Sequence, residues 1–185
     1  MVTLDGFMSG PNGELDWSEA GFDEGVWDGV KRIMSTVEGV LFGRATYQDF
    51  EAYWPAAKSN PKSPRNEREF GEWIDDTAKY VFSNRMKSVE WKNTTLVSED
   101  AAAYVGKLKK QAGGDLLMFG SNTLASALLQ AGLIDDVRLN VYPVLLGDGR
   151  RLFGGLNEKI ALEHVETRNL NSRVVEMRYR PDRAG

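Results

Sequence analysis

Helix-like and strand-like spacings of apolar residues alternate over most of the chain. Residues 1–4 predict only a short strand, whereas residues 22–37 place apolar side chains three and four positions apart, as in an amphipathic helix. Buried strands are predicted by three short apolar runs, at 39–42, 79–83 and 94–98. A helix is expected after the third run, with Ser98 as its N-cap and Gly113–Gly114 at its end.

The segment after the first of these buried strands is rich in turn-forming and charged residues. The sequence GRATYQDF at 43–50 predicts a turn that leads into a short helix. Because Pro55, Pro61 and Pro64 then fall among charged residues, we expect a long surface loop over 51–68.

The second half of the chain changes from a mixed pattern to strands alone. The sequence LLMFGSNTLASALL at 116–129 predicts a strand, a turn of small polar residues and a helix that ends before Gly132. Strand-like alternation then fills 137–144, 161–168 and 173–179, and the last two predict a hairpin that turns near 169–171. The sequence therefore predicts an α/β fold with a mixed, mostly parallel sheet and a C-terminal antiparallel hairpin.

Length, composition and charge narrow the class of protein. A chain of 185 residues that is 42% hydrophobic can bury one full core, so we expect a single domain over 1–185. The net charge is −4 and the basic residues are scattered, which argues against nucleic acid as a partner. No apolar run approaches the ~20 residues of a membrane helix, and no signal peptide is recognisable, so we expect a cytoplasmic protein without membrane partners.

The small number of histidine and cysteine residues argues against several kinds of catalytic and metal site. The chain has one histidine, His164, and no cysteine. A Ser-His-Asp hydrolase would need His164, but no nucleophile-elbow motif occurs, so an ordinary strand residue is the better interpretation. These counts exclude a metal site built from histidine and cysteine, and no carboxylate-rich calcium loop is present, so we expect no metal.

Two strand-to-helix turns are candidate anion sites. Gly43 to Thr46 and Gly120 to Thr123 each follow a predicted strand and offer a glycine, a hydroxyl group and the amides of a helix N-terminus. Arg44 adds a positive charge to the first turn. Alternatively, Ser121 or Asn122 merely caps its own helix. Neither turn matches G-x-G-x-x-G or G-x-x-x-x-G-K-[ST], which disfavours a Rossmann dehydrogenase and a P-loop NTPase.

Four segments together carry a resemblance that spans nearly the whole chain. They read VTLDGFMSGPNGELDW at the start, LFGRATYQDFEAYWP at 41–55, KYVFSNRM at 79–86, and GGDLLMFGSNTLASALLQAGLIDDVRLNVYPVLLGDGRRLF at 113–153. In this order they resemble the dihydrofolate reductase-like family, which includes the reductase domain of the bifunctional riboflavin-biosynthesis protein. The resemblance implies a dihydrofolate reductase-like three-layer sandwich.

The resemblance also implies NADPH as cofactor. In the family, the two turns flank the diphosphate, which assigns it to Gly43, Arg44, Thr46, Gly120, Ser121, Asn122 and Thr123. The end of the YVFS strand lies near the adenosine and its 2′-phosphate, which adds Ser83, Asn84 and Arg85. Arg85 is then the expected partner of the 2′-phosphate, and its alternative is a solvated turn arginine.

The same resemblance indicates which residues lie near the substrate. Several of these residues have an alternative interpretation. The family's LDGF segment passes beside the nicotinamide and substrate, and the loop after it covers them, which implicates Thr3, Asp5, Phe7 and Trp17. Asp5 is equally explained as a turn former. The carboxylate that binds pteridine in dihydrofolate reductases falls on Trp27, a residue that either stacks on a flat heterocycle or belongs to the core. Glu24 and Asp28 could replace that carboxylate or form a solvated acidic face.

The function implied is an NADPH-dependent oxidoreductase that transfers a hydride to a small pyrimidine- or pterin-like substrate, as in riboflavin biosynthesis or dihydrofolate reduction. The alternative is a non-catalytic nucleotide- or pterin-binding protein. Lys58, Lys62 and Arg65 could bind a substrate phosphate or be solvated loop residues. Family members often dimerise, so we expect a homodimer.

Overall fold

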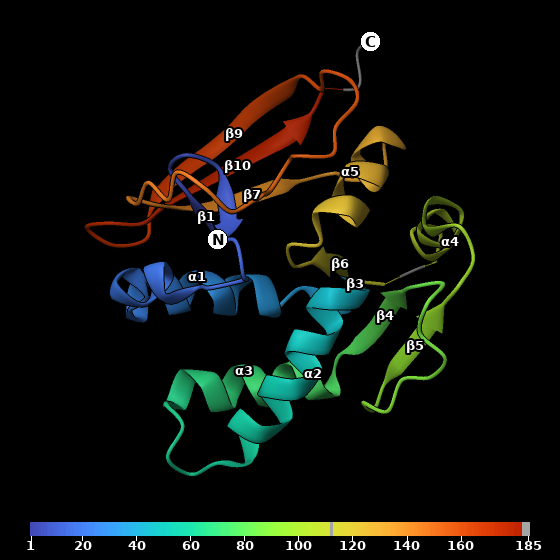
Figure 1. Ribbon diagram of the computed structural model, residues 1–185, viewed down its shortest axis with the longest axis horizontal. Helices are drawn as coiled ribbons and strands as arrows, with labels where there is room; N and C mark the ends of the chain where they lie inside the picture. The colour runs from blue at the N-terminus through green and yellow to red at the C-terminus, as the bar shows by residue number, and fades with distance from the viewer. Residues whose placement is uncertain (112, 183–185) are drawn as a thin grey trace. The chain divides into compact units, whose positions relative to one another are not determined.

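The computed structural model describes residues 1–111 and 113–182. It divides the chain into two compact units (Figure 1): residues 33–124 form one, and residues 1–32 with the chain from 125 onward form the other. The single domain over 1–185 stays a prediction, and residues 112 and 183–185 of that range lie outside the described residues.

A four-stranded parallel sheet organises the unit 33–124. Its strands, in spatial order, are β5 (Thr94–Val97), β4 (Ala78–Phe82), β3 (Val37–Gly43) and β6 (Asp115–Met118). Residues 39–42 of β3 are buried, as expected for a parallel strand covered on both faces. At Gly39 a Cβ atom would lie 2.9 Å from Leu116 Cδ2, so a larger residue would require the Leu116 side chain to move. The four predicted strands of this part are confirmed.

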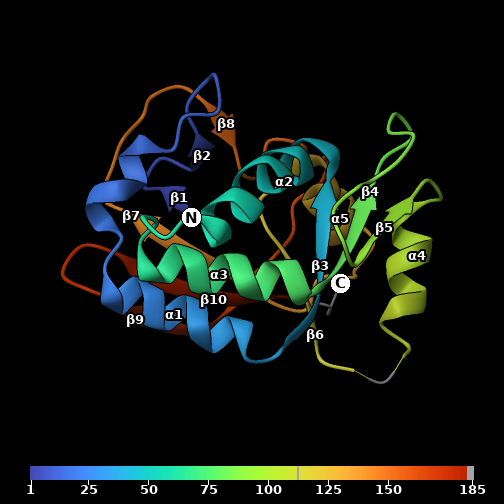
Figure 2. The same ribbon diagram turned by 90° about the horizontal axis from the view of Figure 1, so that it is seen from below.

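Helices cover both faces of this sheet (Figure 2). They are α2 (Arg44–Ser59), α3 (Arg65–Asp76) and α4 (Ala101–Leu108). Leu41 pairs with Tyr80 across β3 and β4, so the next residue, Phe42, points to the opposite face from Tyr80. Tyr47 of α2 contacts Phe42, whereas Tyr104 of α4 contacts Tyr80. Within this unit the sheet is therefore the middle of three layers.

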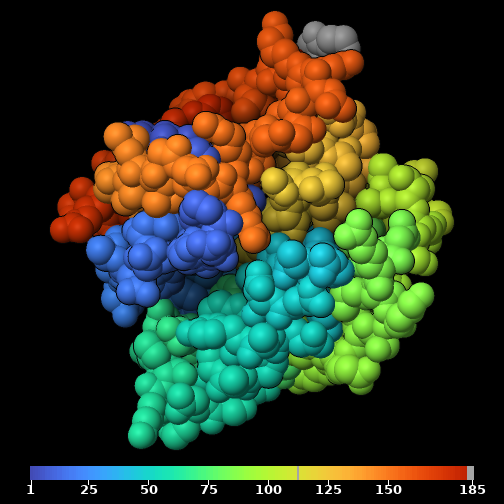
Figure 3. Space-filling view, in the orientation of Figure 1, coloured from blue at the N-terminus to red at the C-terminus, as the bar shows by residue number. Residues whose placement is uncertain are grey.

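The surface loop expected over 51–68 is wrong. Helix α2 continues to Ser59 with Pro55 inside it, and α3 begins at Arg65. Aromatic packing between the two helices stabilises them: the Phe50 and Phe70 rings lie 5.9 and 4.3 Å from the ring of Trp54. Only residues 60–64 connect the helices, at the lower edge of the surface in Figure 3. Packing of these aromatic side chains therefore stabilises the helix even though a proline lies inside it.

Two predicted helices begin or end elsewhere than expected. Helix α1 (Glu24–Met34) is shorter than 22–37, because the Asp23 carboxylate accepts hydrogen bonds from the amides of Gly25 and Val26 at its start. The N-cap of α4 is Asp100, not Ser98: Asp100 Oδ1 accepts from Ala103 N at 2.8 Å. A carboxylate in this position is a strong N-cap.

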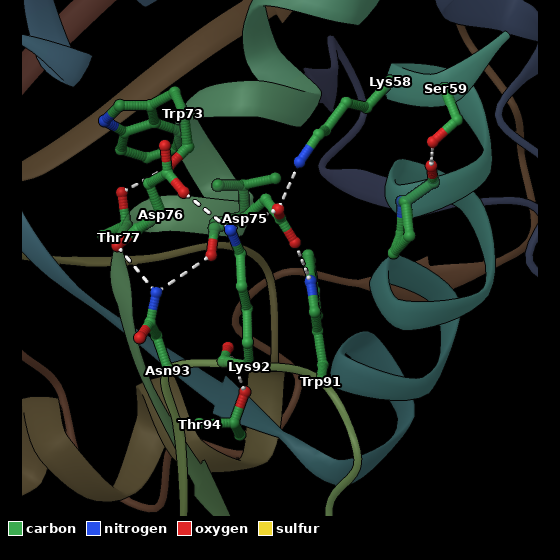
Figure 4. A network of polar contacts seen from close by, with 12 residues as sticks. Lys58, Ser59, Trp73, Asp75, Asp76, Thr77, Trp91, Lys92, Asn93 and Thr94 are labelled. Carbon is green, nitrogen blue, oxygen red and sulfur yellow. Dashed lines mark hydrogen bonds and ion pairs between the residues drawn. The ribbon is translucent and has the colours of Figure 1, made fainter.

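A polar network around Asp75 ties α2, α3 and the segment before β5 together (Figure 4). The buried Asp75 carboxylate accepts hydrogen bonds from Lys58, from Trp91 Nε1 at 2.7 Å and from Lys92 at 2.8 Å. Burial alone would raise the pKa of Asp75, but these three donors outweigh it and hold the pKa well below 3.8. The ionised carboxylate is therefore an integral part of the native packing.

Lys79 lies beside this network and is completely buried. Its ammonium group donates to the carbonyl oxygens of Ile74 (2.8 Å), Asp75 (3.1 Å) and Thr77 (2.8 Å), at and just beyond the end of α3. The group also lies 4.6 Å from the centre of the Trp91 ring. Burial lowers the pKa of Lys79 to about 8, against the opposing effect of Asp75. At neutral pH it satisfies carbonyl groups that the helix leaves without partners.

The second unit is built on another four-stranded sheet. Its strands, in spatial order, are β1 (Val2–Thr3), β7 (Val137–Tyr142), β10 (Val175–Pro181) and β9 (Leu162–Asn169). Strands β2 (Phe7–Ser9) and β8 (Arg150–Arg151) form a separate pair, and the helical elements are the 3-10 helix Asp16–Gly21, most of α1 and most of α5 (Asn122–Gln130). The antiparallel β9–β10 hairpin confirms the prediction for the C-terminus, and the α/β fold class is confirmed. Val26, Tyr142 and Val174 form its core cluster.

Lys79→Met should lower the free energy of unfolding at pH 7 by about 1–3 kcal/mol, because it leaves buried carbonyl groups without donors. Urea unfolding followed by tryptophan fluorescence measures the change. Lys87→Met, at an exposed position, is the matched control and should change stability little. Equal effects of the two substitutions would contradict this role for Lys79.

The lowered pKa of Asp75 predicts a specific acid dependence. An ionised Asp75 contributes stability that is fully present above its unfolded pKa near 3.8 and is lost as the pH falls through the lower folded value. Asp75→Asn should therefore be less stable than the wild type at pH 7, and the difference should shrink below about pH 4. A difference that is the same at both pH values would contradict the pKa assignment.

Candidate functional site

The two turns that the sequence singles out meet through one side chain. Ser121 Oγ accepts a hydrogen bond from Gly43 N at 3.0 Å and donates to Thr46 Oγ1 at 3.0 Å. We call this pair of contacts the Ser121 bridge. It joins the carboxyl ends of the neighbouring strands β3 and β6, where ligands of open α/β sheets bind.

Backbone geometry explains the residue types at the bridge. Gly120 and Ser121 have φ values of 53° and 54°, in the left-handed region that costs a non-glycine residue about 1–2 kcal/mol. At Gly43, a Cβ atom would lie 3.2 Å from Ser121 Oγ, so a side chain there would press on the bridge. Such strain at a non-glycine residue is typical of positions that shape a binding site.

The N-terminus of α2 is suited to hold an anion. Its N-cap is Gly43, no side chain among the described residues caps it, and its first turn holds no acidic residue. The amides of this turn and the helix dipole favour a negative group. Arg44 is exposed, and its guanidinium donates to Gln48 Oε1 at 2.9 Å. A diphosphate fits these donors.

The N-terminus of α5 is arranged differently. Asn122 Oδ1 accepts from Thr123 N at 2.8 Å, so the Asn122 side chain occupies an amide of its own helix. The hydroxyl of Ser121, by contrast, goes to the other turn. The two turns therefore differ in how their small polar side chains are used.

The turn after β4 carries the residues assigned to the adenosine end. Ser83 Oγ accepts hydrogen bonds from the amides of Arg85 (3.1 Å) and Met86 (3.2 Å), which fixes the turn. Asn84 and Arg85 are exposed. Ser83 is therefore a turn-forming residue whose acceptor positions are occupied, and the Arg85 side chain projects from a fixed backbone.

Thr3, Asp5 and Phe7 are brought together in the second unit. Thr3 Oγ1 donates to Asp5 Oδ1 at 2.6 Å and accepts from Phe7 N at 3.0 Å, while Asp5 Oδ2 accepts from Gly147 N at 2.8 Å. These hydrogen bonds, first that of Thr3 and then that of Gly147, lower the pKa of Asp5. The ionised Asp5 carboxylate thus links the loop after β1 to Gly147, and at neutral pH it has no proton to donate.

The partly exposed Trp17 packs against the buried Tyr142 in the same unit. Their ring centroids lie 5.4 Å apart, edge to face. Neither Trp17 Nε1 nor the Tyr142 hydroxyl has a hydrogen-bond partner in the described part of the chain. Burial, followed by the charge of Asp23, raises the pKa of Tyr142 to about 12, so the hydroxyl keeps its proton. Two buried donors without acceptors are unusual, and the sequence analysis did not identify Tyr142.

The candidates on α1 have different surroundings. Trp27 is 5% exposed and belongs to the core, which is one of its two sequence interpretations. Glu24 and Asp28 are both exposed. Asp28 forms an ion pair with Lys31 at 2.6 Å, and the hydrogen bond from Lys31 lowers its pKa.

A group of aromatic rings beside the turns was also missed. Phe119 directly precedes Gly120, and its ring lies 5.4 Å from Phe50 and 5.9 Å from Phe70. Phe50 and Trp54 are partly exposed. The spacing of four residues between Phe50 and Trp54 is typical of one face of a helix. It was not used because a loop was predicted over 51–68.

The described residues contain no group of three or more histidine, cysteine, aspartate or glutamate side chains that could hold a metal ion. None of their helices combines the length and apolarity needed to span a membrane.

The parallel sheet with two linked strand-to-helix turns at its carboxyl edge is typical of an α/β protein of the dihydrofolate reductase-like class. The chain belongs to the RibD C-terminal domain family, whose model matches residues 1–175. It is 33% identical over 178 residues to the uncharacterised protein YyaP of Bacillus subtilis. The alignment covers 96% of this chain and 90% of YyaP.

Solved structures support the same fold. A putative riboflavin biosynthesis protein from Shewanella is similar with a TM-score of 0.75 and 22% identity, over 98% of this chain and 96% of its own. For the Thermotoga maritima deaminase/5-amino-6-(5-phosphoribosylamino)uracil reductase the TM-score is 0.67 and the sequence identity is 18%. The match covers 98% of this chain and 54% of the reductase chain. For dihydrofolate reductase from Enterococcus faecalis, complexed with NADP(H), the TM-score is 0.56 and the sequence identity is 15%. The match covers 98% of this chain and 92% of the reductase chain. The family and these neighbours are consistent with a reductase-like protein.

Two substitutions test the Ser121 bridge. Ser121→Ala removes both hydrogen bonds and keeps the left-handed backbone, so we expect a loss of about 1–2 kcal/mol in unfolding free energy. Ser121→Gly removes the same bonds but relieves the backbone strain, so it should be the more stable of the two variants. Thermal unfolding measures both. A glycine variant less stable than the alanine variant would contradict the bridge geometry.

Proposed function

We propose that this protein is an NADPH-dependent reductase that transfers a hydride to a small heterocyclic substrate. The observation that carries the proposal is the Ser121 bridge, which holds two anion-binding turns together at the carboxyl edge of the parallel sheet. A cofactor with a diphosphate would use both turns, whereas an isolated phosphate would need only one.

Specific residues would hold the cofactor. The amides at the start of α2 would bind the diphosphate, with Gly43, Arg44 and Thr46 on one side. The other side would consist of Gly120, Ser121, Asn122 and Thr123. Arg85 would contact the 2′-phosphate, with Ser83 and Asn84 shaping its turn. Arginine suits this task because its guanidinium forms paired hydrogen bonds with phosphate oxygens.

The bound cofactor would supply the hydride, and the chain would orient the substrate and exclude water. We assign Thr3 and Phe7 to the substrate side, with Asp5 as the ionised anchor of their loop. Trp17, whose ring packs edge to face against Tyr142, would lie on the same side. Of the two carboxylates on α1, Glu24 is the better candidate for proton transfer, because Lys31 lowers the pKa of Asp28.

The substrate class is inferred from the rings beside the turns. Phe50, Trp54 and Phe119 offer partly exposed faces for a flat ring. Lys58 and Arg65 are in ion pairs with Asp75 and Glu69. We therefore favour an aromatic, pyrimidine- or pterin-like substrate over one whose phosphate is held by the α2–α3 cations.

A nucleotide- or pterin-binding protein without turnover is the second candidate. It is favoured by one observation: Asp5 and Asp28, two of the carboxylates that could act in catalysis, are held ionised by hydrogen-bonding partners. The homodimer and the cytoplasmic location stay predictions.

Quenching of tryptophan fluorescence by NADPH, with NADH as the comparison, tests the cofactor. We expect NADPH to bind more tightly, and Arg85→Ala to weaken NADPH by about tenfold or more with a smaller effect on NADH. Arg44→Ala should weaken both if it serves the diphosphate. Arg173→Ala, at an exposed position in the other unit, is the control and should change neither.

Turnover is measured in the same samples by the loss of nicotinamide absorbance with pyrimidine and pterin acceptors. No NADPH binding at high micromolar concentration would contradict the reductase. Binding without oxidation in the presence of any acceptor would favour the second candidate.

A further inference from the structure

A groove of about 700 Å³ lies at the other edge of the parallel sheet. It lies between the C-terminal half of α3 and the start of β3, and both segments contribute acidic and apolar residues to its lining. Because β3 is parallel to its neighbours, its first residues lie at the opposite edge from the cofactor turns. The groove is therefore separate from the candidate cofactor site.

The rim of this groove is strongly acidic. Four carboxylates line it: Glu38, Glu69, Glu72 and Asp76. Lys92 binds Asp76 at 2.8 Å, and Arg65 binds Glu69. Glu38 and Glu72 form no ion pair with any residue that the structure describes. The rim thus keeps two uncompensated negative charges that no basic residue of the lining balances.

The floor of the groove is apolar. It consists of Met34, Val37, Trp73 and Ala78. Trp73 is partly exposed, and its ring lies 5.2 Å from that of Phe70 in α3, which fixes its orientation. A fixed indole ring bordered by carboxylates offers both apolar contact and a cation–π surface.

We propose that this acidic groove is a docking site for a short basic segment of a partner protein, with lysine or arginine side chains next to an apolar one. The cationic groups would pair with Glu38 and Glu72, and the apolar side chain would cover Trp73 and Val37. Nucleic acids and anionic membranes carry the wrong sign of charge for this rim. A peptide segment can carry cationic and apolar side chains together, which matches the acidic and apolar residues of the lining.

The test uses the whole protein and a labelled short peptide in which lysine and leucine alternate, followed by fluorescence anisotropy. We expect saturable binding that weakens by about fivefold or more in the double variant Glu38→Gln/Glu72→Gln. The control variant Glu158→Gln/Glu163→Gln removes the same formal charge at exposed positions of the other unit and should bind as the wild type does. Trp73→Leu should also weaken binding, since it reduces the apolar floor and removes the cation–π surface.

Several results would overturn the proposal. They are absence of saturable binding at millimolar peptide, equal weakening by the groove and control variants, and equal binding of a peptide in which glutamate replaces lysine. Displacement of the peptide by an equal concentration of spermidine would point to a small cation as the occupant instead. Circular dichroism of each variant establishes that it is folded. NADPH binding is measured in parallel and should be unchanged, so the proposal stands or falls independently of the reductase function.

Discussion

The hydrogen bonds of Ser121 are the constraint on which the candidate cofactor site depends. One hydroxyl group accepts from the Gly43 amide and donates to Thr46, so two turns far apart in the sequence are held in one arrangement. Without this link each turn would be a separate helix start. With it, the first amides of α2 and the Gly120 to Thr123 turn present donors to the same region of the sheet edge.

A buried polar network stabilises the rest of the parallel-sheet unit. Asp75 and Lys79 join the end of α3 to α2 and to the residues before β5, and both groups are buried with their hydrogen-bonding capacity used. Such a network is costly to break, because removing one member leaves another buried and unpaired. It ties α3 to α2, the helix that carries Phe50 and Trp54.

Much of this architecture could be predicted from local sequence signals. Buried strands such as β3 and β4 are short apolar runs, and the two turns show as a glycine with small polar residues after a strand. The Ser121 bridge could not be predicted, because its partners are more than 70 residues away in the sequence. The α2–α3 hairpin was misread because the prolines suggested a loop, whereas aromatic packing keeps Pro55 inside a helix. Lys79 gave no signal, since its carbonyl partners come from a helix end whose position the sequence did not fix.

The most direct test of the central claim is a titration of isotope-labelled protein with NADPH, followed by amide chemical shifts in proton–nitrogen spectra. We expect the largest shift changes at Gly43 to Thr46 and at Gly120 to Thr123, and we expect them to be strongly reduced in Ser121→Ala. Large changes confined to other residues, with these two turns unaffected, would contradict it.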